Sequence, residues 1–98
     1  MNILTYKNIE LNLDTIECKI DNEIINLTKN EFLLLKFFIQ PNNLNKVFNR
    51  KELIDSVWKT NVSNRTVDTT ISRLRKKLGN SEKYLITKLG FGYGFVDY

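Results

Sequence analysis

Residues 65–78 read RTVDTTISRLRKKL, and this stretch predicts an amphipathic helix. Apolar side chains recur at steps of four, three and four residues, at Val67, Ile71, Leu74 and Leu78. A helix turns by about 100° per residue, so this spacing aligns all four on one side. Gly79-Asn80-Ser81 follows directly and predicts where the helix ends. The stretch therefore indicates a helix that packs one face against a core.

The opposite side of this helix is cationic, with almost no acidic residue to balance it. Its outward positions are Arg65, Thr69, Ser72, Arg73 and Lys76, and its two flanks carry Arg75 and Lys77. Exposed helices usually mix charge signs, because Glu–Lys pairs one turn apart stabilise them. The one acidic residue is Asp68, which we expect to orient Arg75 or to cap the start of the helix.

The first quarter of the chain predicts a small sheet. Between residues 3 and 27, apolar residues are spaced by two, at Ile9, Leu11, Leu13, Ile16, Cys18 and Ile20. Asp14-Thr15 and Asp21-Asn22 interrupt this alternation with turn-forming residues. We expect an antiparallel meander of short strands with one buried face.

Two further helices have sequence signals at their starts. Thr28 with Glu31, and Asn49 with Glu52, match the capping box, in which the cap and the third residue exchange hydrogen bonds. The first helix is apolar on most sides up to Pro41, so we expect it at the centre of the core. The second is expected at about residues 50–58, before a polar loop at 59–64. Its apolar face consists of Leu53, Ile54, Val57 and Trp58.

The C-terminal segment predicts a β-hairpin. Residues 84–89 and 92–97 are rich in aromatic and β-branched side chains and flank a Gly90-Phe91-Gly92 turn, whose glycines we expect to permit its tightness. Residues 1–98 then form one α+β domain with an N-terminal antiparallel sheet, three helices and this hairpin. A short helix, a polar loop and a basic helix are typical of a helix-turn-helix, and the hairpin would be its wing, with Lys88 near the tip.

The charge distribution indicates an anionic partner. The net charge is +4, but residues 1–49 hold five basic and six acidic side chains, whereas residues 50–88 hold ten basic and four acidic ones. Nucleic acid or a membrane surface would suit the basic half, and a merely solvated helix face would also account for it. A basic helix with short Thr69 and Ser72 side chains fits the major groove, where arginines bind guanine or phosphate. We therefore predict binding to duplex DNA.

Several classes of function find no support in the composition. The chain has no histidine, a single cysteine and no cluster of carboxylates or metal-ligating residues. We therefore predict no enzymatic activity, no cofactor and no metal. No apolar run approaches the roughly 18 residues of a membrane span, and the N-terminus does not resemble a signal peptide. These features predict a cytoplasmic protein without a membrane partner.

Four motifs, in order and at the expected spacings, resemble one family. They are Leu27-Thr28-x-x-Glu31-Phe32-x-Leu34-Leu35, Arg50-x-Glu52-Leu53 with Val57-Trp58, Arg65-Thr66-Val67-Asp68 with Ile71-Ser72-Arg73-Leu74-Arg75-Lys76-Lys77-Leu78, and Ile86-Thr87 with Gly90-x-Gly92-Tyr93-x-Phe95. Together they are similar to the OmpR/PhoB-type winged-helix DNA-binding effector domains of two-component response regulators. The resemblance covers nearly the whole chain.

This resemblance implies a four-stranded N-terminal sheet, major-groove reading by the third helix, minor-groove contact by the wing, and head-to-tail binding to direct repeats. By position it implies DNA contacts from Arg65, Thr69, Thr70, Ser72, Arg73, Arg75, Thr87 and Tyr93; the outward-facing Lys76 and the wing residue Lys88 are further candidates. It also implies contact with the DNA backbone and with RNA polymerase by Trp58 and the loop of Lys59, Thr60, Asn61, Val62 and Ser63. These 98 residues contain no receiver domain. If they are a fragment of a longer protein, we expect a receiver domain elsewhere in that protein.

Two positions depart from the family pattern. Leu89 stands immediately before the first wing glycine, where many members carry arginine, and Ser72 replaces what is often a basic residue. The sequence therefore leaves minor-groove contact by the wing open, and it predicts one phosphate contact fewer. The alternative interpretation is a winged-helix protein-interaction module without nucleic-acid binding, which this wing and the aromatic tail suggest.

Overall fold

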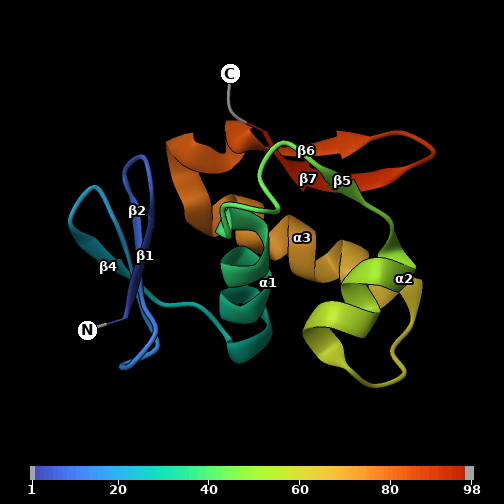
Figure 1. The fold of residues 1–98 in the computed structure, drawn as a ribbon, viewed down its shortest axis with the longest axis horizontal. Helices are drawn as coiled ribbons and strands as arrows, with labels where there is room; N and C mark the ends of the chain where they lie inside the picture. Colours follow the sequence, from blue (N-terminus) through green and yellow to red (C-terminus); the bar gives the residue numbers. More distant parts are fainter. Residues whose placement is uncertain (1, 97–98) are drawn as a thin grey trace.

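The computed structural model describes residues 2–96, in which three helices lie beside two small antiparallel sheets (Figure 1). The N-terminal sheet contains β1 (Ile3–Tyr6), β2 (Ile9–Asn12), β3 (Glu17–Ile20) and β4 (Glu23–Ile25). The helical elements are α1 (Lys29–Ile39), α2 (Arg50–Leu53), the π-turn η1 (Ile54–Trp58), α3 (Asn64–Leu78) and the 3-10 turn η2 (Gly79–Tyr84). The second sheet contains β5 (Val47–Phe48), β6 (Leu85–Lys88) and β7 (Gly92–Phe95). The predicted fold class is confirmed.

The N-terminal sheet is the predicted meander, with strand order β1-β2-β3-β4. Leu11 pairs with Cys18 across β2 and β3, and both side chains are buried on the face that covers the core. Asp21 and Asn22 adopt positive φ values of 53° and 66°, as a tight hairpin turn requires. The expected inward position of Ile16 is wrong: the residue lies in the preceding turn at a φ of 59°, and its side chain is exposed.

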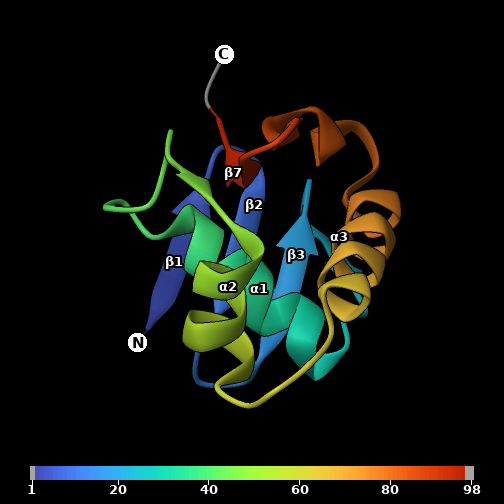
Figure 2. The same ribbon diagram turned by 90° about the vertical axis from the view of Figure 1, so that its right-hand side faces the viewer.

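Helix α1 lies at the centre of the core, as its apolar sequence predicts. Its capping box is present, since the Thr28 hydroxyl accepts from the Glu31 N–H and the Glu31 carboxylate accepts from the Thr28 N–H. The helix contacts β1 on one side and α3, η1 and β7 on others. Figure 2 shows α3 at the right-hand edge of the ribbon with no other element beyond it, so one side of α3 faces outward.

The second predicted helix is regular only in its first turn. Asn49 and Glu52 form the expected capping box at the start of α2. The chain then widens into the π-turn η1, where the Lys59 N–H donates to the Ile54 carbonyl oxygen, five residues back, at 2.8 Å. The prediction of one continuous helix over residues 50–58 is therefore corrected. Capping signals fix where a helix begins but carry no information on the hydrogen-bond pattern further along it.

The second sheet holds a strand that the sequence did not reveal. Its order is β5-β7-β6, and β5 pairs with β7 through Val47 opposite Gly94 and Phe48 opposite Tyr93. A Cβ atom at Gly92 would lie 2.0 Å from the Phe48 carbonyl oxygen. Gly92 thus allows the close approach of β5, whereas Gly90, at a φ of 81°, serves the turn itself.

The predicted hairpin boundaries shift slightly in the structure. Tyr84 belongs to η2, the first strand begins at Leu85, and the second ends at Phe95. Asp97, at the end of the predicted second strand, lies outside the described residues. The 3-10 turn η2 connects α3 to the hairpin, where the sequence predicts only that the helix ends.

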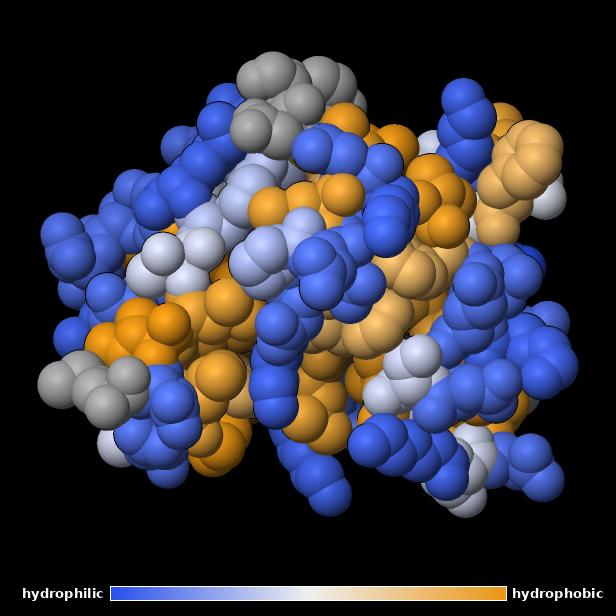
Figure 3. Space-filling view, in the orientation of Figure 1, coloured by the Kyte–Doolittle hydropathy of each residue, from blue (hydrophilic) through white to orange (hydrophobic). Residues whose placement is uncertain are grey.

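The core is continuous across both sheets, and it joins Ile9 and Leu11 of β2 to Leu35 and Phe38 of α1 and Phe95 of β7. Figure 3 shows hydrophobic residues over the middle of one face, and again at the upper right, where the tip of the β6–β7 hairpin lies. Among residues 2–96, no helix has both the length and the apolar character that crossing a membrane would require.

Candidate nucleic-acid interface

The two faces of α3 are separated as the sequence predicts. Its apolar stripe is buried, at Val67, Ile71, Leu74 and Leu78. Its outward side carries four exposed polar side chains, Arg65, Ser72, Arg73 and Lys76. The Ser63 hydroxyl caps the helix by accepting from the Thr66 N–H at 3.2 Å. Within residues 2–96, no carboxylate pairs with the three outward cations. The stripe of positive charge therefore faces solvent.

A shallow hollow flanks this outward side where the start of α1 approaches α3. Arg65, Thr69 and Arg73 line it from α3, and Thr28 and Asn30 line it from the start of α1. The neighbouring Thr70 is half-buried, and its hydroxyl donates to the Thr66 carbonyl oxygen at 2.8 Å within the helix. Thr69 and Thr70 both line this hollow and both are half-buried, but the hydroxyl of Thr70 already has a partner within the helix.

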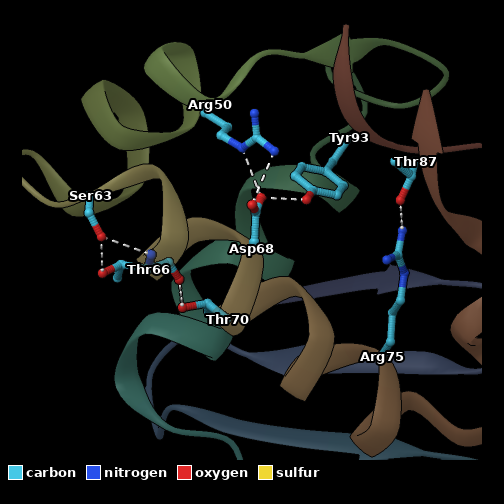
Figure 4. A network of polar contacts seen from close by, with 8 residues as sticks. All are labelled: Arg50, Ser63, Thr66, Asp68, Thr70, Arg75, Thr87 and Tyr93. Atoms are coloured by element: carbon cyan, nitrogen blue, oxygen red, sulfur yellow. Dashed lines mark hydrogen bonds and ion pairs between the residues drawn. The ribbon is translucent and has the colours of Figure 1, made fainter. Parts of the chain in front are cut away.

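Asp68 joins three elements of the fold (Figure 4). Arg50 at the start of α2 donates two hydrogen bonds to it, Nε to Oδ1 at 2.8 Å and Nη2 to Oδ2 at 3.0 Å. The Tyr93 hydroxyl on β7 donates to the same Oδ1 at 2.5 Å. Asp68 is an ion-pair and hydrogen-bond partner, as expected, but the expectation that it orients Arg75 or caps α3 is wrong, because its partners lie on α2 and β7.

These contacts also shift the pKa values of the Asp68 carboxyl and of the Tyr93 hydroxyl. The hydrogen bonds from Arg50 hold the pKa of the Asp68 carboxyl below its ordinary value, and the Tyr93 hydroxyl adds to this effect. Burial raises the pKa of Tyr93, and its hydrogen bond to the carboxylate raises it further. Both residues therefore keep the protonation states that the hydrogen bond needs at neutral pH.

Arg75 fastens α3 to the first strand of the wing. Its Nε donates to the Leu85 carbonyl oxygen at 3.0 Å, and its Nη2 donates to the Thr87 hydroxyl at 2.6 Å (Figure 4). Its guanidinium also lies 5.7 Å from the centre of the Tyr93 ring. Arg75, Thr87 and Tyr93 were predicted as DNA contacts, and the structure gives their polar groups partners within the domain.

The tip of the wing combines charged and apolar exposed residues. Lys88 is exposed, and so are Leu89 and Phe91 on either side of Gly90. The tip borders a hollow of about 410 Å³, which is also lined by Arg50 and Lys51 at the start of α2. Sequence reasoning missed Arg50 and Lys51 as part of this face, since nothing in the order of residues places the start of α2 beside the wing.

The loop before α3 is exposed next to a half-buried tryptophan. Lys59, Thr60, Asn61 and Ser63 are exposed, and Val62 is half-buried. Lys59 has a positive φ of 58°, which ends η1. The buried indole N–H of Trp58 donates to no acceptor in the part of the chain that the structure describes. Trp58 borders a third hollow, of about 370 Å³, with Leu33 and Phe37 of α1.

Comparison with known proteins identifies the family. Residues 21–95 match the family described as transcriptional regulatory protein, C terminal. The chain belongs to this family. It is an OmpR/PhoB-type winged-helix domain, as its motifs indicate. This chain is 42% identical over 91 residues to a curated relative, the uncharacterized transcriptional regulatory protein YclJ of Bacillus subtilis. The match covers 89% of this chain and 39% of YclJ. The chain is 34% identical over 99 residues to SrrA of Staphylococcus aureus, covering 95% and 40%.

Solved structures of the same family have the same fold. The DNA-binding domain of the response regulator AdeR, solved in complex with an intercistronic region, is 36% identical with a TM-score of 0.84, covering 96% of this chain and 99% of that one. The DNA-binding domain of CpxR from E. coli is 27% identical with a TM-score of 0.82, covering 99% and 98%. The chain spans about two fifths of the length of the curated relatives that it matches, 39% and 40% for YclJ and SrrA.

Proposed function

We propose that this chain binds duplex DNA sequence-specifically as the effector domain of a two-component response regulator, with α3 in the major groove and the β6–β7 hairpin as the wing. The observation that carries the proposal is the outward side of α3, where Arg65, Arg73 and Lys76 are exposed without a carboxylate partner in residues 2–96. The role is binding rather than catalysis, and it requires no cofactor.

The chemistry of α3 suits a polyanion with readable edges. Arg65 and Arg73 can each fork onto guanine O6 and N7 or onto a phosphate, and the short side chain of Thr69 lets the helix approach the bases. Lys76, a turn further along, supplies a point charge for the backbone. The similarity to the AdeR domain, whose solved structure contains an intercistronic region, supports the same partner for this chain.

The longer relatives support a wider role for the whole protein. We propose that a receiver domain accompanies this domain in a cytoplasmic regulator, and that two copies bind direct repeats head to tail. Trp58 and the exposed loop of residues 59–63 would contact the DNA backbone and RNA polymerase, and the hollow beside Trp58 offers an apolar surface for such a contact.

A titration of duplex DNA at several salt concentrations tests the proposal. The probe is a fluorescent duplex selected by the chain from a random pool, and binding is followed by anisotropy. Because each neutralised phosphate releases about 0.9 of a counterion, log affinity should fall with log salt at a slope of about −3.6 or steeper for four or more contacts. A scrambled duplex of equal length should bind more weakly.

A protein-interaction module is the second candidate, because Leu89 and Phe91 are exposed at the wing tip. For such a module, the salt slope would be near zero, and the selected and scrambled duplexes would bind equally weakly. That result would contradict DNA binding and favour a protein partner.

A further inference from the structure

The tip of the wing carries two large, exposed apolar side chains. The Leu89 side chain is 88% exposed and Phe91 is 69% exposed, the two highest values among the large hydrophobic residues in the range 2–96. Figure 3 shows the tip as a hydrophobic patch beside hydrophilic atoms at the upper right. Neither side chain is among those that form the core or pack against it.

The tip is held in a fixed place relative to α3. Hydrogen bonds between side chains tie the wing to α3 at two points. Arg75 of α3 donates to Thr87, the residue before Lys88, and Tyr93, the residue after Gly92, donates to Asp68 of α3. Only residues 88–92 extend past these two ties. The hairpin therefore cannot fold back onto the domain to hide its tip without breaking contacts that join it to α3.

Charged side chains, most of them cationic, border the tip on the side of the helices. Arg50, Lys51 and Lys88 line the hollow of about 410 Å³ between the tip and the starts of α2 and α3. Arg50 pairs with Asp68 and Lys51 with Asp55, and Glu52 lines an adjoining hollow with Lys88 and Phe91. In duplex DNA, one sugar–phosphate strand separates the major groove from the next minor groove. With α3 in the major groove, that strand would cross this hollow, and the tip beyond it would meet the minor groove.

We propose that Leu89 and Phe91 enter this minor groove as an apolar wedge, which unstacks a base step and bends the duplex. The inference rests on the duplex binding proposed above and names how the wing takes part in it. Leucine and phenylalanine act in this way in proteins that bind the minor groove, where they partly separate stacked bases. The wing then selects deformable steps such as TA or CA/TG through their low cost of bending, without hydrogen bonds to bases.

A protein partner suits the tip less well. A specific protein interface covers about 800 Å² on each partner, far more than two side chains can offer. Lys88 stands directly beside the tip and pairs with no carboxylate in residues 2–96, and charged groups are depleted from the cores of protein interfaces. Both features favour a narrow groove lined by phosphates over a flat protein surface.

The test measures DNA bending and affinity with the tip removed. The wild-type chain and the double variant Leu89→Ser/Phe91→Ser are titrated with the selected duplex, labelled at both ends for energy transfer. We expect the wild type to shorten the end-to-end distance and the double variant to lose most of this bend. We also expect affinity to fall by about tenfold or more, as the loss of burial for two apolar side chains implies. Because phosphate contacts remain, the salt slope should not change.

Ile24→Ser is the matched control, since Ile24 is also exposed but lies on β4, in the other sheet. It should leave bend and affinity at the wild-type values, and thermal denaturation should show both variants folded. Equal bending by wild type and double variant overturns the wedge while leaving DNA binding in place. The wedge is also overturned if the double variant loses bend and affinity on a duplex with two half-sites but not on a duplex with one half-site. In that case, the tip would contact a second copy of the chain rather than the minor groove. If the wild type binds no duplex at all, the proposed function fails and the wedge fails with it.

Discussion

At the scale of single residues, the cations of α3 divide into two groups. Arg65, Arg73 and Lys76 are exposed, and no carboxylate in residues 2–96 pairs with them. Arg75 and Lys77 are partly buried and have partners on β6 and α1. The first group is available to a ligand, whereas the second holds the domain together.

Replacing Arg73 with alanine should weaken binding to the selected duplex by about 1–3 kcal/mol, because a forked cation on guanine or phosphate is lost. The melting temperature should hardly change, since Arg73 is exposed. Anisotropy titration and thermal denaturation measure the two effects. Lys19→Ala is the control, because it removes one exposed positive charge from β3. If both variants lose the same affinity, only net charge matters and the role given to Arg73 is wrong.

Asp68 should make stability depend on pH near 4. Its hydrogen bonds from Arg50 lower the pKa of its carboxyl in the folded state. Such a carboxyl stabilises the fold above its unfolded pKa of about 3.9, and this contribution is lost as the pH falls through the lower folded value. Asp68→Asn should therefore be less stable than the wild type at neutral pH, with a difference that shrinks in acid. Urea denaturation from pH 7 down to about pH 3 follows it. A difference that stays constant over this range contradicts the linkage.

Helical spacing predicted the directions of the α3 side chains but not their partners. Val67 and Ile71 are buried and Arg73 is exposed, as their spacing requires. The pairing of Asp68 with Arg50 and Tyr93 joins residues 18 and 25 positions apart on three different elements. Periodicity within one helix carries no information on which side chains meet across such junctions.

At the scale of elements, the second sheet depends on Gly92. Its φ of 145° and the 2.0 Å between a Cβ there and the Phe48 carbonyl oxygen mean that Gly92→Ala must push β5 away from β7. We expect a loss of about 2 kcal/mol or more in unfolding free energy. Gly90→Ala meets nothing within 4 Å and pays only for its positive φ, so about 1 kcal/mol is expected. Urea denaturation compares the two, and equal losses would mean that the approach of β5 is not the cause.

The contact between α1 and α3 depends on Lys77. Its ammonium donates to Glu31 Oε1 at 2.6 Å, and the Glu31 side chain is only 2% exposed. Lys77→Ala leaves this carboxylate without its cation and should lower stability by about 1–3 kcal/mol, while DNA affinity of the folded protein stays the same. The neighbouring, exposed Lys76 should behave in the opposite way when replaced by alanine. A drop in affinity for Lys77→Ala without a loss of stability would contradict this division.

Elements with long patterns or capping signals could be predicted, and short ones could not. The capping boxes at Thr28 and Asn49 located two helix starts correctly. The strand β5 has two residues, too few for any alternation to be recognised, and it exists because glycines on β7 let it approach. The π-turn η1 likewise has no recognisable signal in the order of its residues.

At the scale of the whole molecule, two ties fix the spacing between α3 and the wing. One joins Arg50, Asp68 and Tyr93, and the other joins Arg75 to Thr87 and to the Leu85 carbonyl. A face that is already ordered loses little conformational entropy on binding. The charge of the two halves of the chain predicted an anionic partner, but only the folded structure brings the cations at the start of α2 and at the wing tip to one hollow beside the start of α3.

Methylation protection of the selected duplex tests most directly whether α3 occupies the major groove, because guanine N7 lies there. The bound wild-type chain should protect guanines inside the selected site, and the double variant Arg65→Ala/Arg73→Ala should lose that protection at concentrations that still give binding. If the chain occupies the duplex while every guanine N7 in the site stays reactive, α3 does not read the major groove and the central claim is wrong.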